Sequence, residues 1–148
     1  MRKNFISKVI TGTLIAMAAV SISSAAVNVA MANNSGDKPY NFSFDYGSSD
    51  ETEVRDKEDG SAAYMTCTYC NYTDFGYSAT VYGCNGYAKN GSIKCSNAYN
   101  YYEGTTRYQS NTVKSNGKDY AYFRASLNAY DVAYYEGWWS PDNVNCYD

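Results

Sequence analysis

The five cysteines are the residues of this 148-residue sequence whose type and spacing come closest to a chemical function. Two of them form Cys67-Thr68-Tyr69-Cys70, which has the spacing of a redox-active pair. Redox pairs of this kind open a helix, where the helix dipole lowers the thiol pKa. Here the apolar residues Met65, Cys67 and Tyr69 occupy every second position, and this alternation is typical of a strand. The pattern therefore argues against thiol–disulfide exchange as the activity.

Disulfide bonds are the expected use of the cysteines, because the chain is predicted to be exported to an oxidising compartment. We expect a local bridge between Cys84 and Cys95, across a loop rich in turn residues. A second bridge is expected from Cys146 to Cys67 or Cys70, with Cys70 taken as its partner; closing so long a loop stabilises by about 3–5 kcal/mol. Five is an odd number, so one thiol is left over for an intermolecular disulfide.

Patterns typical of catalysis and metal binding are weak. The chain contains no histidine, which removes Ser-His and Cys-His nucleophile pairs. Ser115-Asn116-Gly117-Lys118 matches Ser-x-x-Lys by letter, but Asn-Gly is typical of a turn. The acids between residues 47 and 61 are expected in a solvated loop, and the cysteine spacing does not fit a zinc site. We therefore predict no enzymatic activity, no cofactor and no metal centre.

Aromatic side chains are the most unusual feature of the sequence, with 18 Tyr and 2 Trp. Several predicted strands carry rings on both faces, whereas a two-layer sandwich buries only one face of each strand. Some rings should therefore be exposed, where a tyrosine or tryptophan suits sugars, peptides or headgroups. The alternative is that cross-strand tyrosine ladders only stabilise the sheet. The residues predicted to bind a ligand lie in the last strand and just after it: Tyr134, Tyr135, Trp138 and Trp139.

Residues 1–32 are predicted to be a secretory signal peptide. Arg2, Lys3 and Lys8 give it a positive start, an apolar stretch follows, and Ala30-Met31-Ala32 offers a cleavage site. An uncleaved membrane anchor is the alternative, but the apolar stretch is diluted by Ser, Thr and Gly residues, and no second stretch is long enough to span a bilayer. We expect a soluble, secreted product with no stable membrane span after cleavage.

The charge of the exported part argues against nucleic-acid binding. Three of the 12 Lys and Arg residues precede residue 33, so nine remain against 15 Asp and Glu, a net charge of −6. Affinity for nucleic acid comes mainly from Lys and Arg that displace counterions from phosphates. We therefore expect no nucleic-acid partner.

The elements that would position these residues are strands. Residues 40–46 alternate between aromatic and polar, and strand-like stretches recur at 62–70, 76–83, 98–102, 107–113, 119–127 and 130–136. We predict an all-β domain at 40–148, an antiparallel β-sandwich or small partly open barrel of seven to eight short strands. It would follow the helical signal peptide and a flexible lead-in at 33–39. Aromatic rings must fill its core, because aliphatic residues are few.

Residues at the two ends of the exported part carry a resemblance. After a signal peptide, the chain has an early Lys38-Pro39-Tyr40-Asn41-Phe42-Ser43-Phe44 and a closing Tyr135-Glu136-Gly137-Trp138-Trp139-Ser140-Pro141-Asp142. Together these resemble small exported bacterial proteins classed only as a domain of unknown function. That layout is similar to the lactococcin-type secreted bacteriocins, which are β-sandwiches with a tryptophan-bearing end. The five cysteines, the tyrosine surplus and the acidity depart from the bacteriocin pattern.

These observations favour a secreted, non-enzymatic binding protein. The bacteriocin resemblance implies recognition of a cell-wall precursor, with the segment 137–139 as a contact surface. A carbohydrate-binding module that binds a glycan is the first alternative. A disulfide-linked interaction protein of the cell envelope is the second.

Overall fold

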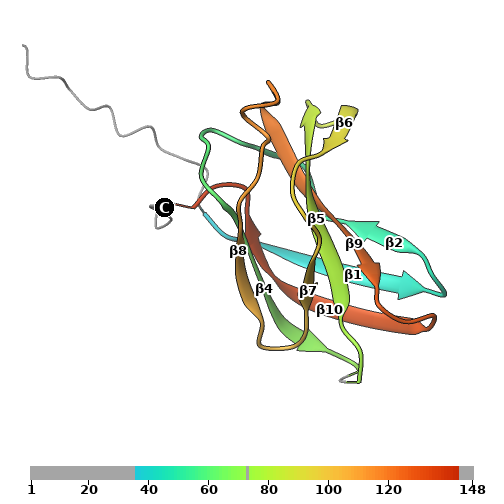
Figure 1. Ribbon diagram of the computed structural model, residues 1–148. Helices are drawn as coiled ribbons and strands as arrows, with labels where there is room; N and C mark the ends of the chain where they lie inside the picture. Colours follow the sequence, from blue (N-terminus) through green and yellow to red (C-terminus); the bar gives the residue numbers. More distant parts are fainter. Residues whose placement is uncertain (1–35, 73, 144–148) are drawn as a thin grey trace, which may run out of the picture. The chain divides into compact units, whose positions relative to one another are not determined.

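The computed structural model describes residues 36–72 and 74–143, and these residues form strands, turns and loops without a helix (Figure 1). They belong to one compact unit and build two antiparallel sheets, which confirms the predicted all-β sandwich; the two sheets do not close into one. In chain order the strands of the described residues are β1 (Lys38–Asp45), β2 (Ser49–Glu51), β3 (Arg55–Asp56), β4 (Ala63–Cys70), β5 (Tyr77–Asn85), β6 (Asn90–Lys94), β7 (Tyr99–Tyr101), β8 (Thr106–Gln109), β9 (Tyr120–Leu127) and β10 (Val132–Ser140).

The first sheet has four strands in the order β1-β10-β4-β8. The second has the order β2-β9-β5-β6, and β3 pairs with β9 while β7 pairs with β5. Along the described strands the chain changes sheet six times: from β1 to β2, β3 to β4, β4 to β5, β7 to β8, β8 to β9 and β9 to β10. β10, the last of the described strands, lies in the interior of its sheet, between β1 and β4.

Alternation of side chains explains β1. Tyr40, Phe42 and Phe44 point into the sandwich and are buried, while the residues between them are exposed. Across the ladder, Phe44 faces Ala133 and Tyr40 faces Gly137, so that a large ring meets a small residue on the partner strand. This complementarity, together with the period of two, fixes the register of β1 on β10.

Aromatic rings fill the space between the sheets, as the shortage of aliphatic residues predicted. Tyr77 lies at the centre: its ring stacks on Tyr101 at 5.2 Å and meets Phe42 and Tyr135 edge to face at 5.4 and 4.9 Å. Offset and edge-to-face pairs of this kind contribute about 0.5–1.5 kcal/mol each beyond area burial.

The hydroxyl groups of the four tyrosines buried between the sheets are hydrogen-bonded. Tyr40 and Tyr77 share a hydrogen bond of 2.5 Å, the amide of Gln109 donates to the Tyr101 hydroxyl at 2.8 Å, and Tyr135 donates to the Phe75 carbonyl at 2.6 Å. Burial raises the pKa of the Tyr135 phenol to about 12 and raises that of Tyr77 further. These four rings can be buried because each polar tip has a partner. Tyr122, in a smaller cluster with Val54 and Cys84, is an exception, since its buried hydroxyl has no hydrogen-bond partner among the described residues.

The prediction of a solvated loop at 47–61 was wrong in part. The segment contains β2 and β3, both of which pair with β9, and its Val54, Arg55 and Lys57 side chains are buried. Lys57 Nζ lies 2.6 Å from Asp142 Oδ1, and both side chains are fully enclosed. The alternation signal failed here because these edge strands are short and their buried positions carry charged residues that are paired inside the protein.

The segment between Cys84 and Cys95, predicted to be a loop rich in turn residues, contains both a turn and a strand. β5 ends at Asn85 and β6 begins at Asn90, so the residues between them form a four-residue connection rather than a two-residue hairpin turn. Gly86 and Lys89 have φ angles of +89° and +57° there. The last predicted strand also extends beyond Glu136 to Ser140, because its pairing with β4 continues past Gly137.

Several predictions fall outside the described residues: the signal peptide at 1–32, the first residues of the lead-in, and Cys146 with its bridge. None of the described residues forms a helix long and apolar enough to cross a membrane.

Candidate functional site

The alternation of β10 separates the four residues predicted to bind a ligand. Tyr135 and Trp139 point into the sandwich and are 0% exposed. They are packing residues, which leaves Tyr134 and Trp138 on the outside of the sheet, with Trp138 46% exposed. The sequence places four rings in six residues, and the pleat of the strand divides them equally between core and surface.

The outer face of the first sheet gathers further rings around these two. Tyr134 and Trp138 come from β10, Tyr64 and Tyr69 from β4, and Tyr108 from β8. Register places them: Tyr64 faces Tyr108, and Glu136, which lies between Tyr134 and Trp138, faces Tyr69. The ring centroids are 5.3 Å apart for Tyr64–Tyr108 and 6.5 Å apart for Tyr69–Tyr134. We call these five residues the aromatic face.

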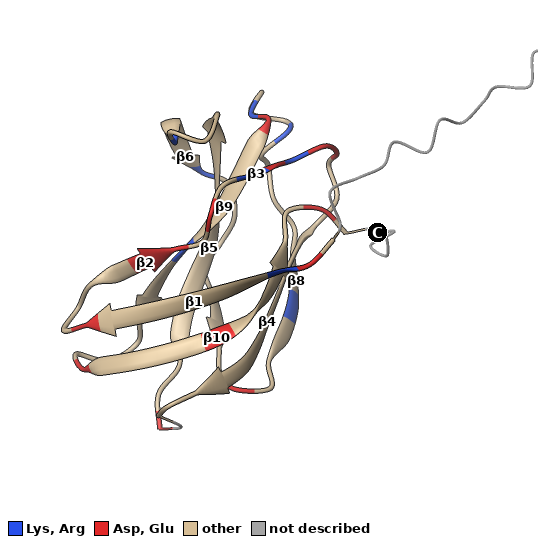
Figure 2. Ribbon diagram, turned by 180° about the vertical axis from the view of Figure 1, so that it is seen from behind, with Lys and Arg blue, Asp and Glu red and all other residues tan. Residues whose placement is uncertain are grey.

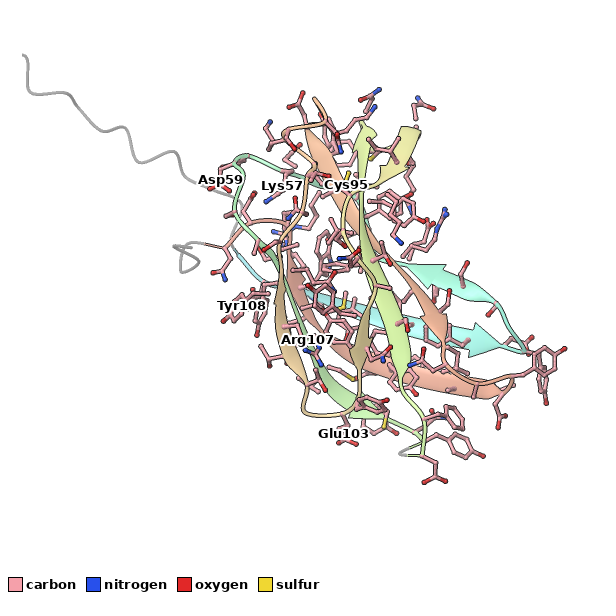
Figure 3. The ribbon with its side chains drawn as sticks, viewed as in Figure 1. Lys57, Asp59, Cys95, Glu103, Arg107 and Tyr108 are labelled. Atoms are coloured by element: carbon pink, nitrogen blue, oxygen red, sulfur yellow. The ribbon has the colours of Figure 1, made fainter. Side chains whose placement is uncertain are left out.

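Tyr108 illustrates the orientation of the aromatic face. In Figure 3 its ring points away from the second sheet, whereas the side chain of its neighbour Arg107 points toward the second sheet. Arg107 donates to the Asn100 carbonyl at 3.0 Å and lies over the Tyr99 ring, both on the β7 side. Tyr108 is 51% exposed, so its ring is available at the surface.

A β-bulge puts Tyr69 on the aromatic face. In the β10–β4 ladder, Gly137 faces Cys67 and Glu136 faces Tyr69, so Thr68 is an extra residue in β4. Because of the bulge, Cys67 and Cys70 both point into the core. In a regular strand, two residues that are three positions apart would lie on opposite faces. Sequence alternation alone missed this shift, and no signal in the sequence marks it.

Gly137 positions Trp138 by allowing a close approach. A Cβ atom at Gly137 would lie 1.8 Å from the Thr66 carbonyl oxygen and 2.7 Å from the Tyr40 hydroxyl. The Tyr40 hydroxyl donates to that same carbonyl at 3.1 Å, filling the space. Trp139 is fixed on the inner side, because Arg55 donates to its carbonyl at 3.0 Å and lies over its ring. Trp138 therefore stands on a rigid backbone.

Polar groups lie among the rings of the aromatic face. The Tyr134 hydroxyl donates to the Glu136 carboxylate at 2.7 Å, which raises the pKa of Tyr134. Asn41 on β1 lies opposite Glu136 in the ladder. The hydroxyl groups of Thr66 and Thr106 are 2.9 Å apart. Figure 2 shows few charges on β1, β10 and β4, and the one acidic position on β10 is Glu136.

A groove of about 450 Å³ runs beside Trp138. Its walls come from β1, from the segment after β2, from the bulge of β4 and from β10; the lining residues are Pro39, Tyr40, Asn41, Glu51, Thr52, Glu53, Thr68, Glu136, Gly137 and Trp138. This volume lies in the lower range of small-molecule sites. Within the aromatic face, Trp138 is therefore a ring that is both half-exposed and part of the groove wall.

The carboxylate of Glu51 is already engaged. It pairs with Lys89 and, at 2.6 Å, with Arg124. Partial burial alone would raise the pKa of Glu51, but hydrogen bonds from the two cations outweigh it and lower the pKa. Glu51 therefore stays ionised and is unsuited to act as a general acid.

The structure corrects the predicted bridge between Cys84 and Cys95. Both are free thiols, and they lie in different clusters: Cys95 belongs to the main core between the sheets, and Cys84 to a smaller cluster with Val54 and Tyr122. Because β5 alternates, Cys84 and Val81 face opposite sides of the sheet, and the Cys95 amide donates to the Val81 carbonyl at 2.8 Å. Cys70 is likewise a buried free thiol.

Comparison with known proteins adds a family but no activity. The model of a family described as "Protein of unknown function (DUF2712)" matches residues 28–143. No curated protein and no solved structure matches the chain. Nothing in these comparisons links the chain to bacteriocins. Since the match spans well over half of the sequence, the chain belongs to the DUF2712 family of proteins of unknown function.

Proposed function

We propose that this protein is a secreted, non-enzymatic binding protein that recognises a glycan of the cell wall through the aromatic face. The observation that carries the proposal is Trp138, whose half-exposed ring stands beside the groove and among four tyrosines of one sheet surface. Export is the prediction from residues 1–32, and it would bring this surface into contact with extracellular polymers.

The chemistry of the aromatic face suits a sugar. Tyrosine and tryptophan rings offer flat apolar area with a polar tip, and both can stack on the apolar face of a pyranose. Glu136, Asn41 and Thr68 supply hydrogen-bonding groups beside Trp138. Trp138 and Tyr134 are four residues apart on one strand, a span of about 13 Å, which suits an oligosaccharide rather than a monosaccharide.

Binding without turnover fits the residues present. The chain has no histidine. Hydrolysis of a glycan would need a pair of carboxyl groups in which one is held protonated. Glu51, in the wall of the groove, is instead held ionised by Lys89 and Arg124.

The test is sedimentation of the purified chain with peptidoglycan sacculi and with chitin, and titration with the lipid-linked precursor of peptidoglycan. We expect binding to one of the polymers, and a Trp138→Ala variant that binds about 30-fold more weakly, because truncation of a central tryptophan costs about 2 kcal/mol. Binding to the precursor alone would support the bacteriocin-like reading instead.

The matched control is Tyr87→Ala. Tyr87 is also an exposed ring, 65% accessible, but it lies in the connection between β5 and β6 and packs on Tyr120 of the second sheet. The Tyr87→Ala variant should bind the polymer as tightly as the native protein does. Equal loss in the two variants, or no binding by the native chain to any of the three ligands, would contradict the proposal.

The alternative of a disulfide-linked envelope protein now depends on one residue. Cys67, Cys70, Cys84 and Cys95 are all buried, so none of them is presented for a bridge to another molecule. Cys146 lies outside the described residues and stays the candidate. Non-reducing electrophoresis of the native chain and of Cys146→Ser tests it, since only the native chain would form a dimer.

A further inference from the structure

A second pocket lies at the opposite end of β4 from Tyr64. It has a volume of about 310 Å³ and is lined by Cys70, Tyr72, Phe75, Tyr102 and Glu103, none of which lines the groove at Trp138. The residues come from the end of β4, the approach to β5 and the connection from β7 to β8. Figure 3 labels Glu103 at this end of the molecule, at the foot of the β7–β8 connection. We call these five residues the aromatic box.

Three rings form the walls of the box. Tyr72 and Phe75 are stacked with centroids 5.7 Å apart and planes inclined by 16°. Tyr102 reaches the box over Gly76, where a Cβ atom would lie 2.8 Å from two Tyr102 ring carbons. Glycine at this position therefore admits the ring. Tyr72 and Tyr102 are each 48% exposed, so the box is open to a ligand.

The turn that carries Glu103 is fixed in place. The Thr105 amide donates to the Tyr102 carbonyl at 3.0 Å, and Gly104 has a φ of +80°. Two backbone hydrogen bonds join this turn to Cys67 of β4, at 2.8 and 2.9 Å. Phe75 is held as well, because its carbonyl accepts the Tyr135 hydroxyl at 2.6 Å. The box is thus largely preorganised, which lowers the entropic cost of binding.

The carboxylate of Glu103 has no cationic partner. Within residues 36–72 and 74–143, no Lys or Arg forms an ion pair with it. Its Oε2 atom lies 3.5 Å from the Sγ atom of Cys70, and that thiol lies closer, at 2.9 Å, to the Tyr72 carbonyl oxygen. Burial, followed by the neighbouring Glu103, raises the pKa of Cys70, so the thiol is neutral and Glu103 is the only charge in the box.

We propose that the aromatic box binds a quaternary ammonium cation, with the size and chemistry of a trimethylammonium headgroup. Faces of aromatic rings attract such cations through the ring quadrupole, and one adjacent carboxylate balances the charge. A primary ammonium needs three hydrogen-bond acceptors, whereas the walls of the box are mainly ring faces and Glu103 is its one carboxylate. A quaternary ammonium needs none. The small volume fits a headgroup and not an oligosaccharide.

Titration of the full chain with choline, followed by tyrosine-region chemical shifts or calorimetry, tests the proposal. The comparison ligand is 3,3-dimethyl-1-butanol, which has the shape of choline without its charge. We expect saturable binding of choline and affinity for the neutral analogue that is roughly tenfold lower. Equal affinity for the two ligands, or no saturable binding of choline, would overturn it.

Two variants locate the site. Glu103→Gln keeps the shape of the box and removes its charge, and it should weaken choline binding about tenfold while leaving the neutral analogue unaffected. Glu136→Gln, on the aromatic face, is the matched control and should bind choline like the native chain. If both variants lose choline binding equally, the effect is one of net charge and the box is not the site. Choline binding that survives in Trp138→Ala separates this inference from the glycan proposal.

Discussion

The Lys57 ammonium and the Asp142 carboxylate meet 2.6 Å apart with no exposure of either side chain. Asp142 also accepts the backbone amide of Glu58 at 3.0 Å, and Lys57 donates to the Ser61 carbonyl at 2.6 Å. One enclosed ion pair thus joins the segment after β3 to the residues that follow β10. Burial lowers the pKa of Lys57, and the hydrogen bond to Asp142 opposes that shift.

Removal of one member of this pair should be costly. Asp142→Ala leaves a buried ammonium without its partner, and we expect a loss of about 3–5 kcal/mol in the free energy of unfolding, measured by urea denaturation. The double variant Lys57→Met/Asp142→Ala should recover at least about 1 kcal/mol of that loss, because it removes the unpaired charge.

The control for this prediction is an exposed ion pair of equal length. Lys114 Nζ lies 2.6 Å from Asp119 Oδ1, but the Asp119 side chain is 75% exposed. Lys114→Met should cost no more than about 1 kcal/mol. Similar losses for Asp142→Ala and Lys114→Met would mean that the Lys57–Asp142 pair is solvated.

Gly137→Ala should destabilise the protein through contact and not through backbone conformation. Its added Cβ would meet the Thr66 carbonyl oxygen at 1.8 Å, so β4 and β10 would have to separate at the bulge. We expect a loss of about 3 kcal/mol or more, measured by denaturant titration. Gly60→Ala, where nothing lies within 4 Å of the added atom, should change stability by less than about 0.5 kcal/mol.

The buried tyrosines predict unfolding in alkali. The pKa of Tyr135 is raised by burial from 10.0 to about 12, and those of Tyr40, Tyr77 and Tyr101 are raised further by the same cause. Below pH 10 the folded and unfolded chains bind the same protons at these groups. Above it the unfolded chain loses phenolic protons that the folded chain keeps, so stability falls as the pH rises from 10 toward 12.

Ultraviolet absorbance of tyrosinate, recorded together with near-ultraviolet circular dichroism, measures this effect. The buried rings should ionise only when the dichroism of the fold is lost. A single reversible ionisation of all tyrosines without loss of that signal would show that the core is not closed.

The thiols should be unreactive in the native protein. Burial, followed by the neighbouring Cys70, raises the pKa of Cys67 to about 11, so little thiolate is present at neutral pH. Alkylation of native protein, followed by peptide mapping, should leave Cys67, Cys84 and Cys95 unmodified until denaturant is added. The same map should contain no peptide that joins Cys84 to Cys95. Finding that bridge would mean that the end of β5, which carries Cys84, or the segment just after β6, which carries Cys95, is rearranged.

The sequence predicted the strands whose buried face is continuous and missed those whose pairing depends on neighbours. β1 alternates rings with polar residues, and its bounds were close to those of the structure. β2, β3 and β6 carry no apolar period, because their ladders lie at the periphery and their side chains are polar or charged. Pairing with β9 or β5 makes them strands, and local sequence does not contain that information.

The four residues predicted to bind a ligand all lie on β10, and two of them, Tyr134 and Trp138, are on the outside of the sheet. Period-two alternation assigns Trp138 and Trp139 to opposite faces, but not which face is outside. That choice is set by Arg55 and Phe123, which hold Trp139 within the core. Tyr69 joined the aromatic face only through the bulge at Thr68, and Tyr64 and Tyr108 through the register of β4 with β8. Long-range pairing of this kind is invisible to a local pattern.

The extra residue at Thr68 explains the Cys-x-x-Cys spacing by strand geometry and not by thiol chemistry. Since the ladder on either side of Thr68 stays in phase with β10, the strand behaves as a regular one that has absorbed an insertion. Deleting that residue would shorten the spacing to Cys-x-Cys and keep every neighbouring side chain on its present side. The two-residue spacing between Cys67 and Cys70 is therefore what a one-residue bulge produces in a strand that turns both of these side chains toward the core.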